Sequence, residues 1–330
     1  MIGIFKQKAS TNALVLFVYA LVLKFPLFLH PYLPVLHPED NYLYRFILGI
    51  LQSFFGQHAG FYALLSFLLL FSQATLLNGI CNYHKVLPRQ NYLPAMCYIL
   101  LSSLLPDWGH FSAPLLVNSI TIWCWYRMVG LYNNQKPVST IFNFGVLLGL
   151  ATLLYMPAIA FLLLLFFALI IMRPFRVQEW FIGFLGFTAP YYFLILILYF
   201  THQLEWGNLI PRVRLTFPSI PDSVWIIVAI SLVVIPFIIG GIFVQNNLNK
   251  MLIHVRKSWS LLLVFLVASV FVIIINKAGS YENWIVSIMP FAVFHAAAYF
   301  YSGNKIPMLI LHWISFAVAL WMNFMVTFAA

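Results

Sequence analysis

Long apolar runs recur along the whole chain and most strongly constrain what it can fold into. They extend over roughly 15–24 residues each, close to the about 20 apolar residues that a transmembrane helix needs. Only 7% of the 330 residues are charged, against about 25% in a soluble domain, so the chain has too little polar surface to be soluble. Because backbone groups in lipid must be satisfied internally, and because the runs are continuous rather than alternating, we expect α-helices.

The fold class that follows is an all-α, polytopic transmembrane bundle of about eleven spans, with a cytoplasmic N-terminus and an interfacial amphipathic helix after the first span. Pro157 interrupts one long apolar stretch, and we expect a tight turn there, since proline removes a backbone hydrogen bond. Gly145 and Gly149 have the small-xxx-small spacing of closely packed helices. The expected spans are 10–33, 59–81, 92–106, 112–131, 140–154, 157–172, 179–201, 223–245, 259–276, 283–301 and 306–327.

The distribution of charge sets the predicted orientation. With the N-terminus in the cytoplasm, twelve of the 17 Lys and Arg residues fall on the cytoplasmic side and four on the outer side, as the positive-inside rule requires. Six of the seven Asp and Glu residues fall outside. The basic residues are scattered between apolar runs and form no patch, so the net charge of +10 does not indicate nucleic-acid binding.

Two adjacent carboxylates, Glu39 and Asp40, lie in the first predicted outer loop, residues 30–58. Apolar residues with helical spacing follow over 42–55, which predicts a helix in the interface plane. A carboxylate here could act as general base on an acceptor hydroxyl. The structural alternative is a solvated loop start in which Asp40 caps the following helix.

Other polar residues of the outer side complete the candidate site. Arg212 and Arg214 suit phosphate recognition, although contact with lipid headgroups or with nearby acids explains them equally well. The candidate phosphate and substrate contacts are His37, Arg45, Arg212, Arg214, Lys277 and Glu282. The outer histidines show no recognisable ligand spacing, so we predict no metal or other cofactor and keep a divalent metal as an alternative.

The order of these features resembles the GT-C superfamily of membrane glycosyltransferases. The stretch His37-Pro38-Glu39-Asp40 is similar to the His-Pro-Asp-Glu of that superfamily, with the two acids exchanged, and a helix follows it. Gly149-Leu150-Ala151-Thr152 resembles its mid-chain glycine-rich helix. Tyr281-Glu282-Asn283-Trp284, followed by Pro290, is similar to its late Glu-x-Arg-Tyr…Pro turn, although the arginine is absent. The chain also resembles uncharacterised polytopic inner-membrane proteins of bacteria.

The resemblance implies one integral membrane domain, residues 1–330, in a bacterial inner membrane. In it, 10–201 form a GT-C-like module, and 202–330 supply an outer loop and the C-terminal helices. It further implies inverting transfer of a sugar from a polyprenyl-phosphate donor at the outer face, with Asp40 or Glu39 as the base. Membrane lipids and this donor are the expected partners. Two alternatives stay open, namely a transporter or flippase of a lipid-linked substrate and a non-enzymatic scaffold of an envelope complex.

Overall fold

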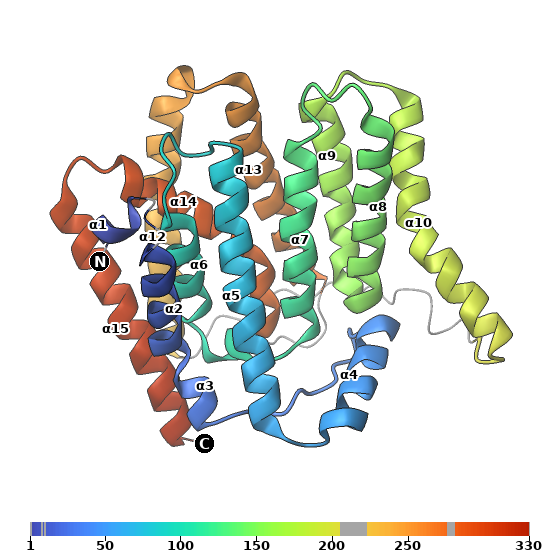
Figure 1. The fold of residues 1–330 in the computed structure, drawn as a ribbon, viewed down its shortest axis with the longest axis horizontal. Coiled ribbons are helices and arrows are strands. Elements are labelled where there is room, and N and C mark those ends of the chain that lie inside the picture. Colours follow the sequence, from blue (N-terminus) through green and yellow to red (C-terminus); the bar gives the residue numbers. More distant parts are fainter. Residues whose placement is uncertain (1, 8, 10, 205–222, 276–280, 330) are drawn as a thin grey trace.

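The structure, a computed structural model, describes residues 2–7, 9, 11–204, 223–275 and 281–329. Every regular element in these ranges is a helix, and the helices run side by side as a bundle (Figure 1). The first half contains α1 (Ile2–Phe5), α2 (Thr11–Lys24), α3 (Pro26–Leu29), α4 (Tyr42–Phe55), α5 (Ala59–Tyr83), α6 (Leu93–Ser102), η1 (Pro106–Gly109), α7 (Ala113–Val129) and α8 (Pro137–Leu154). The second half contains η2 (Met156–Phe161), α9 (Leu162–Met172), α10 (Val177–Phe200), α12 (Val224–Asn247), η3 (Leu248–Lys250), α13 (Ile253–Ile274), η4 (Tyr281–Ser287), α14 (Ile288–Tyr301) and α15 (Lys305–Ala329). The prediction of an all-α polytopic fold is confirmed.

Each of the eleven predicted spans contains a helix, but the helices differ in length. Within the described ranges, seven are long and apolar enough to cross a membrane: α5, α8, α10, α12 with η3, α13, η4 with α14, and α15. By contrast, α2 has 14 residues and α6 has ten, and at 1.5 Å per residue neither reaches across about 30 Å of hydrocarbon. The chain is a multi-pass membrane protein, whereas the number of crossings and the orientation stay predictions.

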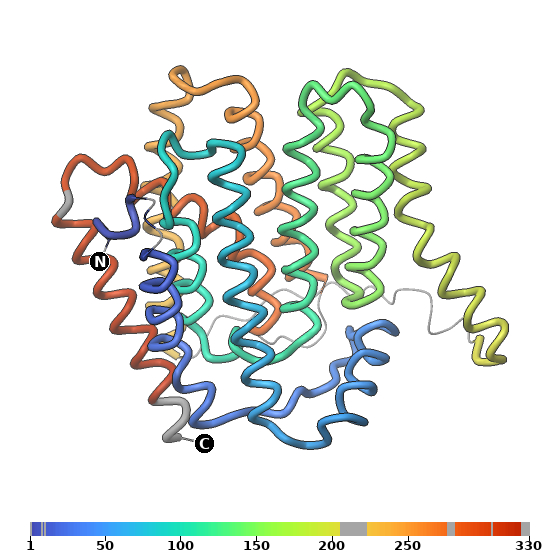
Figure 2. Tube along the Cα trace, in the orientation of Figure 1, coloured from blue at the N-terminus to red at the C-terminus, as the bar shows by residue number. Residues whose placement is uncertain are grey.

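The helix break predicted at Pro157 is present. Helix α8 ends at Leu154, and Tyr155 adopts an extended conformation, with φ −141° and ψ 113°. The chain then reverses through η2 into α9, so that α8 and α9 lie side by side (Figure 2). The prediction that residues 140–172 form two helices joined by a turn is therefore confirmed. They do not form one kinked helix.

Glycines allow α8 to pack against α10 at backbone distance. A Cβ at Gly145 would overlap the carbonyl oxygen of Gly183, and one at Gly149 would overlap the carbonyl oxygen of Phe187. On the other helix, a Cβ at Gly186 would overlap the carbonyl oxygen of Phe142. The close packing predicted from Gly145 and Gly149 is confirmed. This packing holds the C-terminal end of α8 in place beside α10.

Helix α4 lies at the end of the bundle that also carries α3 and the C-terminus, below the end of α8 (Figure 1). Its bounds, Tyr42–Phe55, coincide with the predicted amphipathic segment. Tyr44 and Leu48 are buried against the bundle, while Phe46, Ile50 and Phe54 are exposed. The chain between α3 and α4, which carries the two acids, thus passes close to the α8–η2 turn.

Candidate functional site

The backbone around Glu39 and Asp40 is joined to the turn between α8 and η2. The Met156 N–H donates to the Glu39 carbonyl oxygen at 3.1 Å, and the Asn41 N–H donates to the Leu154 carbonyl oxygen at 3.0 Å. Asp40 and Tyr155 thereby form an isolated antiparallel bridge. This pairing is available because Tyr155, at the helix break, has extended backbone. The acidic stretch is thus fixed against the bundle and is not a freely solvated loop.

Asn41, and not Asp40, caps helix α4. The Asn41 side chain accepts a hydrogen bond from the Tyr42 N–H at 2.7 Å. Its Nδ2 also donates to the Thr152 carbonyl oxygen in α8 at 2.8 Å. The structural alternative, in which Asp40 is the capping residue, is therefore wrong, because the cap falls one residue later where the chain enters the helix. Asp40 is left without this structural task.

The Asp40 carboxylate is buried and only half satisfied. Asp40 is 4% exposed. Its Oδ2 accepts a hydrogen bond from the His37 N–H at 2.8 Å. The other oxygen, Oδ1, is buried with no hydrogen-bond partner among the described residues. Burial raises the pKa of Asp40 from 3.8 to about 6; the His37 N–H opposes this rise, while the charges of Glu282 and Glu39 add to it. A carboxylate with such a pKa and a free lone pair is suited to accepting a proton near neutral pH.

His37 links the acidic loop to the turn before α14. Its Nε2 lies 3.3 Å from Oε2 of Glu282, whose side chain is 14% exposed. The hydrogen bond with Glu282 raises the pKa of His37, while partial burial opposes that rise. The η4 turn is held in turn by Trp108, whose Nε1 donates to the Tyr281 carbonyl oxygen at 2.8 Å. Two segments that are about 240 residues apart in sequence therefore meet at Asp40.

We use the term Asp40 centre for His37, Glu39, Asp40, Tyr155 and Glu282. Glu39 is 8% exposed and Tyr155 is 1% exposed. The Tyr155 hydroxyl, like Asp40 Oδ1, is buried and has no hydrogen-bond partner in the part of the chain that the structure describes. Buried polar atoms are normally bonded, and here two unbonded atoms lie on residues whose backbones are paired.

A second acid–histidine pair lies near this centre. Burial raises the pKa of Asp107 and lowers that of His110, and both groups respond to the charge of Glu282. The Tyr32 ring packs on the His110 ring at 4.4 Å between centroids. Asp107 and His110 extend the acidic surface toward η1.

The sequence-predicted residues divide into three groups. Glu39, Asp40, His37 and Glu282 are brought together in the Asp40 centre. Arg45 is exposed on α4, and its Nε donates to the Asp40 carbonyl oxygen at 3.0 Å, so its guanidinium borders the centre. Arg212, Arg214 and Lys277 lie outside the described residues.

Sequence reasoning did not select Tyr155, Asp107 or His110. The signal for Tyr155 was its place directly before Met156-Pro157, where a helix break exposes backbone for pairing. No group of three His, Cys, Asp or Glu residues within the described ranges has an arrangement that could hold a metal ion.

Fold and site together define a class: a polytopic helical membrane protein with a buried acidic centre at one end of the bundle. A similar solved structure is the crystal structure of ArnT from Cupriavidus metallidurans bound to undecaprenyl phosphate, with a TM-score of 0.50 and 16% sequence identity. The match covers 88% of this chain and 60% of the ArnT chain. This likeness shows that the chain shares the fold of ArnT, in agreement with the polytopic helical fold that the GT-C resemblance implied. The chain itself belongs to a family of unknown function, DUF6427, whose model matches residues 42–328. No curated protein matches this sequence.

Proposed function

We propose that this protein is a GT-C-like glycosyltransferase that uses a polyprenyl-phosphate sugar at the outer face of the inner membrane, with Asp40 as the base. The observation that carries the proposal is the unpaired, buried Oδ1 of Asp40. Burying a charged oxygen without a partner is costly, and such cost is common at sites where the missing partner is a substrate.

The chemistry would proceed in one displacement. Asp40 Oδ1 takes the proton of the acceptor hydroxyl while the hydroxyl oxygen forms a bond to the anomeric carbon. The bond from that carbon to the phosphate oxygen breaks, and its electron pair leaves with the polyprenyl phosphate. The anomeric carbon is inverted, since no covalent sugar–enzyme intermediate forms.

Cationic residues would stabilise the charge that develops on the leaving phosphate. Arg45 borders the Asp40 centre and can reach a phosphate there. The same role is proposed for Arg212, Arg214 and Lys277. Burial keeps the Asp40 pKa near 6, and the negative charges of Glu282 and Glu39 add to this rise. Glu39 is proposed as the second acid that contacts the acceptor.

Polar side chains inside the helices give little support to the transporter alternative. Tyr98 donates to Gln73 Oε1 at 2.6 Å, and Asn118 donates to the Tyr98 hydroxyl at 2.6 Å. Likewise, Nε2 of His295 is bonded to the Val233 carbonyl oxygen at 2.7 Å. In the described part of the chain, the hydrogen bonds of these groups are made to other helices, where they contribute to packing.

The test is transfer by the purified protein in proteoliposomes, measured as release of undecaprenyl phosphate from glucosyl, mannosyl and galactosyl donors. For a donor that the wild type uses, Asp40→Asn with Glu39→Gln should lower the rate at least about 100-fold. The rate of the wild type should rise with pH through about 6, where Asp40 ionises. Ser53→Ala, an exposed change on α4, is the matched control. Full activity in the folded double variant would refute Asp40 as the base.

A further inference from the structure

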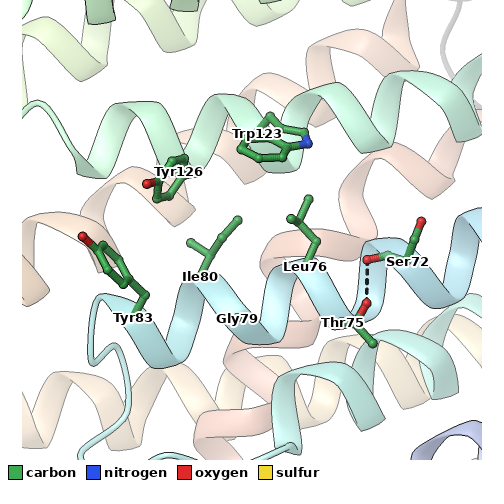
Figure 3. Close-up of a pocket in the computed structure, with 8 residues that line it drawn as sticks. All are labelled: Ser72, Thr75, Leu76, Gly79, Ile80, Tyr83, Trp123 and Tyr126. Atoms are coloured by element: carbon green, nitrogen blue, oxygen red, sulfur yellow. Dashed lines mark hydrogen bonds between the residues drawn. The ribbon is translucent and has the colours of Figure 1, made fainter. Parts of the chain in front are cut away.

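A groove of about 520 Å³ lies between α5 and α7, away from the Asp40 centre (Figure 3). Ser72, Thr75 and Gly79 form its α5 wall, Trp123 and Tyr126 form its α7 wall, and Tyr83 closes one end. Tyr83 and Trp123 are 73% and 43% exposed, so the groove opens to the surroundings of the bundle.

The surface of the groove is apolar despite its hydroxyl groups. The Ser72 hydroxyl donates to the Leu69 carbonyl oxygen at 2.8 Å, and the Thr75 hydroxyl donates to the Phe71 and Ser72 carbonyl oxygens at 3.0 Å (Figure 3). These hydroxyls are therefore satisfied by their own helix. Most of the remaining lining is methyl, methylene and aromatic surface, which suits a hydrocarbon chain, and the Tyr83 and Tyr126 hydroxyls and the Trp123 N–H are its other polar groups.

The groove has the length of one membrane leaflet. From Ser72 to Tyr83 a helix rises about 16 Å, which is close to half of the about 30 Å hydrocarbon thickness. A transmembrane helix from a partner would need a contact surface of roughly twice this length. An acyl chain of a lipid in one leaflet matches it.

Positive charge gathers where the groove ends at Tyr83. Lys85 and Arg89 follow α5 and are exposed. Arg127 lies over the Tyr126 ring at 5.9 Å. In the described ranges, neither of the two salt bridges involves these three residues. This end of α5 is the one farther from α4 and the acidic loop (Figure 1).

We infer that the groove between α5 and α7 binds an anionic phospholipid, with an acyl chain along Ser72–Tyr83 and the phosphate beside Arg127 and Lys85. The small residues of α5 could also admit a second copy of this chain. Two parallel copies would, however, bring their Lys85, Arg89 and Arg127 clusters together, which like-charge repulsion disfavours. The inference does not depend on the proposed transferase activity.

Native mass spectrometry of the full-length protein tests this inference. The protein is equilibrated in detergent with equal amounts of dioleoyl-phosphatidylglycerol and dioleoyl-phosphatidylcholine, and retained lipid is counted. The wild type should retain phosphatidylglycerol preferentially. Gly79→Leu should abolish this retention, because a Cβ at Gly79 meets nothing within 4 Å and the larger side chain would occupy the groove.

Two further variants make the result specific. Gly60→Leu lies on the same helix, is equally open and is outside the groove, so it should retain lipid as the wild type does. Arg127→Gln should weaken the preference for phosphatidylglycerol about fivefold. Equal retention of the two lipids by the wild type, or equal retention by Gly79→Leu and Gly60→Leu, would overturn the inference. If Gly79→Leu disrupted a dimer of the protein but retained as much lipid as the wild type, the inference would be overturned, and the groove would be assigned to contact with a second copy of the chain.

Discussion

Asp40 has only one carboxylate oxygen bonded within the described part of the chain, although it is 4% exposed. The neighbouring residues take over the local structural tasks, since Asn41 caps α4 and the backbone of Glu39 and Asn41 holds the loop on α8. The bonded oxygen of Asp40, Oδ2, holds only the local turn through the His37 N–H. The other oxygen, Oδ1, makes Asp40 a candidate for contact with a substrate.

A pH effect on stability follows from this burial. The pKa of Asp40 is 3.8 in the unfolded chain and about 6 in the folded one, so the folded state binds its proton more tightly. The proton on Asp40 therefore adds to the free energy of unfolding. This stabilisation is fully present below pH 3.8 and is lost as pH rises through about 6, which lowers the free energy of unfolding by about 3 kcal/mol. Asp40→Asn should lack this loss. Its thermal stability relative to wild type should therefore increase between pH 4.5 and pH 8.

Titrating neighbours contribute to both curves, and the difference between wild type and variant includes the effect of the Asp40 charge on the pKa of His37. His37 and Asp107, whose pKa values are raised, destabilise the fold in the same direction as pH rises, whereas His110, whose pKa is lowered, acts in the opposite direction. All three are present in both proteins. Parallel curves of melting temperature against pH for wild type and variant would contradict the buried, proton-binding Asp40.

At the residue scale, the sequence indicated part of the centre. The rarity of acids and their place beside a predicted span were enough to select Glu39 and Asp40. The pairing of His37 with Glu282 and the contact of Asp40 with Tyr155 join segments far apart in sequence. No local pattern encodes such contacts, because they depend on how the helices pack.

At the element scale, the end of α8 is the support of the site. Gly145 and Gly149 could be recognised from their spacing, but their partners Gly183 and Phe187 on α10 could not, since the spacing does not identify the opposing helix. The same holds for Thr152 and Leu154, whose carbonyl oxygens receive hydrogen bonds from Asn41. The α8–α10 contact thus positions the backbone that holds the acids.

Gly145→Ala should destabilise the protein by about 1–3 kcal/mol, because the added methyl group overlaps the backbone of α10. Gly241→Ala in α12 is the matched control, since a Cβ there meets nothing within 4 Å. The measurement is the melting temperature of the purified variants in the same detergent. Equal melting temperatures for the two variants would show that α8 and α10 are not in backbone contact.

For the whole molecule, composition and apolar runs predicted the all-α polytopic fold and the positions of the helices. The largest difference concerns residues 10–33, where α2 ends at Lys24 and Pro26 begins the separate short helix α3. Proline and glycine near the ends of apolar runs shorten helices in ways that hydropathy does not register. The arrangement in space, with the acidic loop, η1 and η4 at one end, required the packed fold.

The central claim is that Asp40 acts as the base beside a bound polyprenyl-phosphate donor whose phosphate is held by cationic side chains. The most direct measurement is a cryo-EM structure of the protein in lipid nanodiscs supplied with undecaprenyl phosphate. The account predicts phosphate density beside Arg45 at the edge of the Asp40 centre, with the prenyl chain leading from there into the membrane. Undecaprenyl phosphate bound elsewhere on the protein, with the Asp40 centre closed and empty, would contradict it.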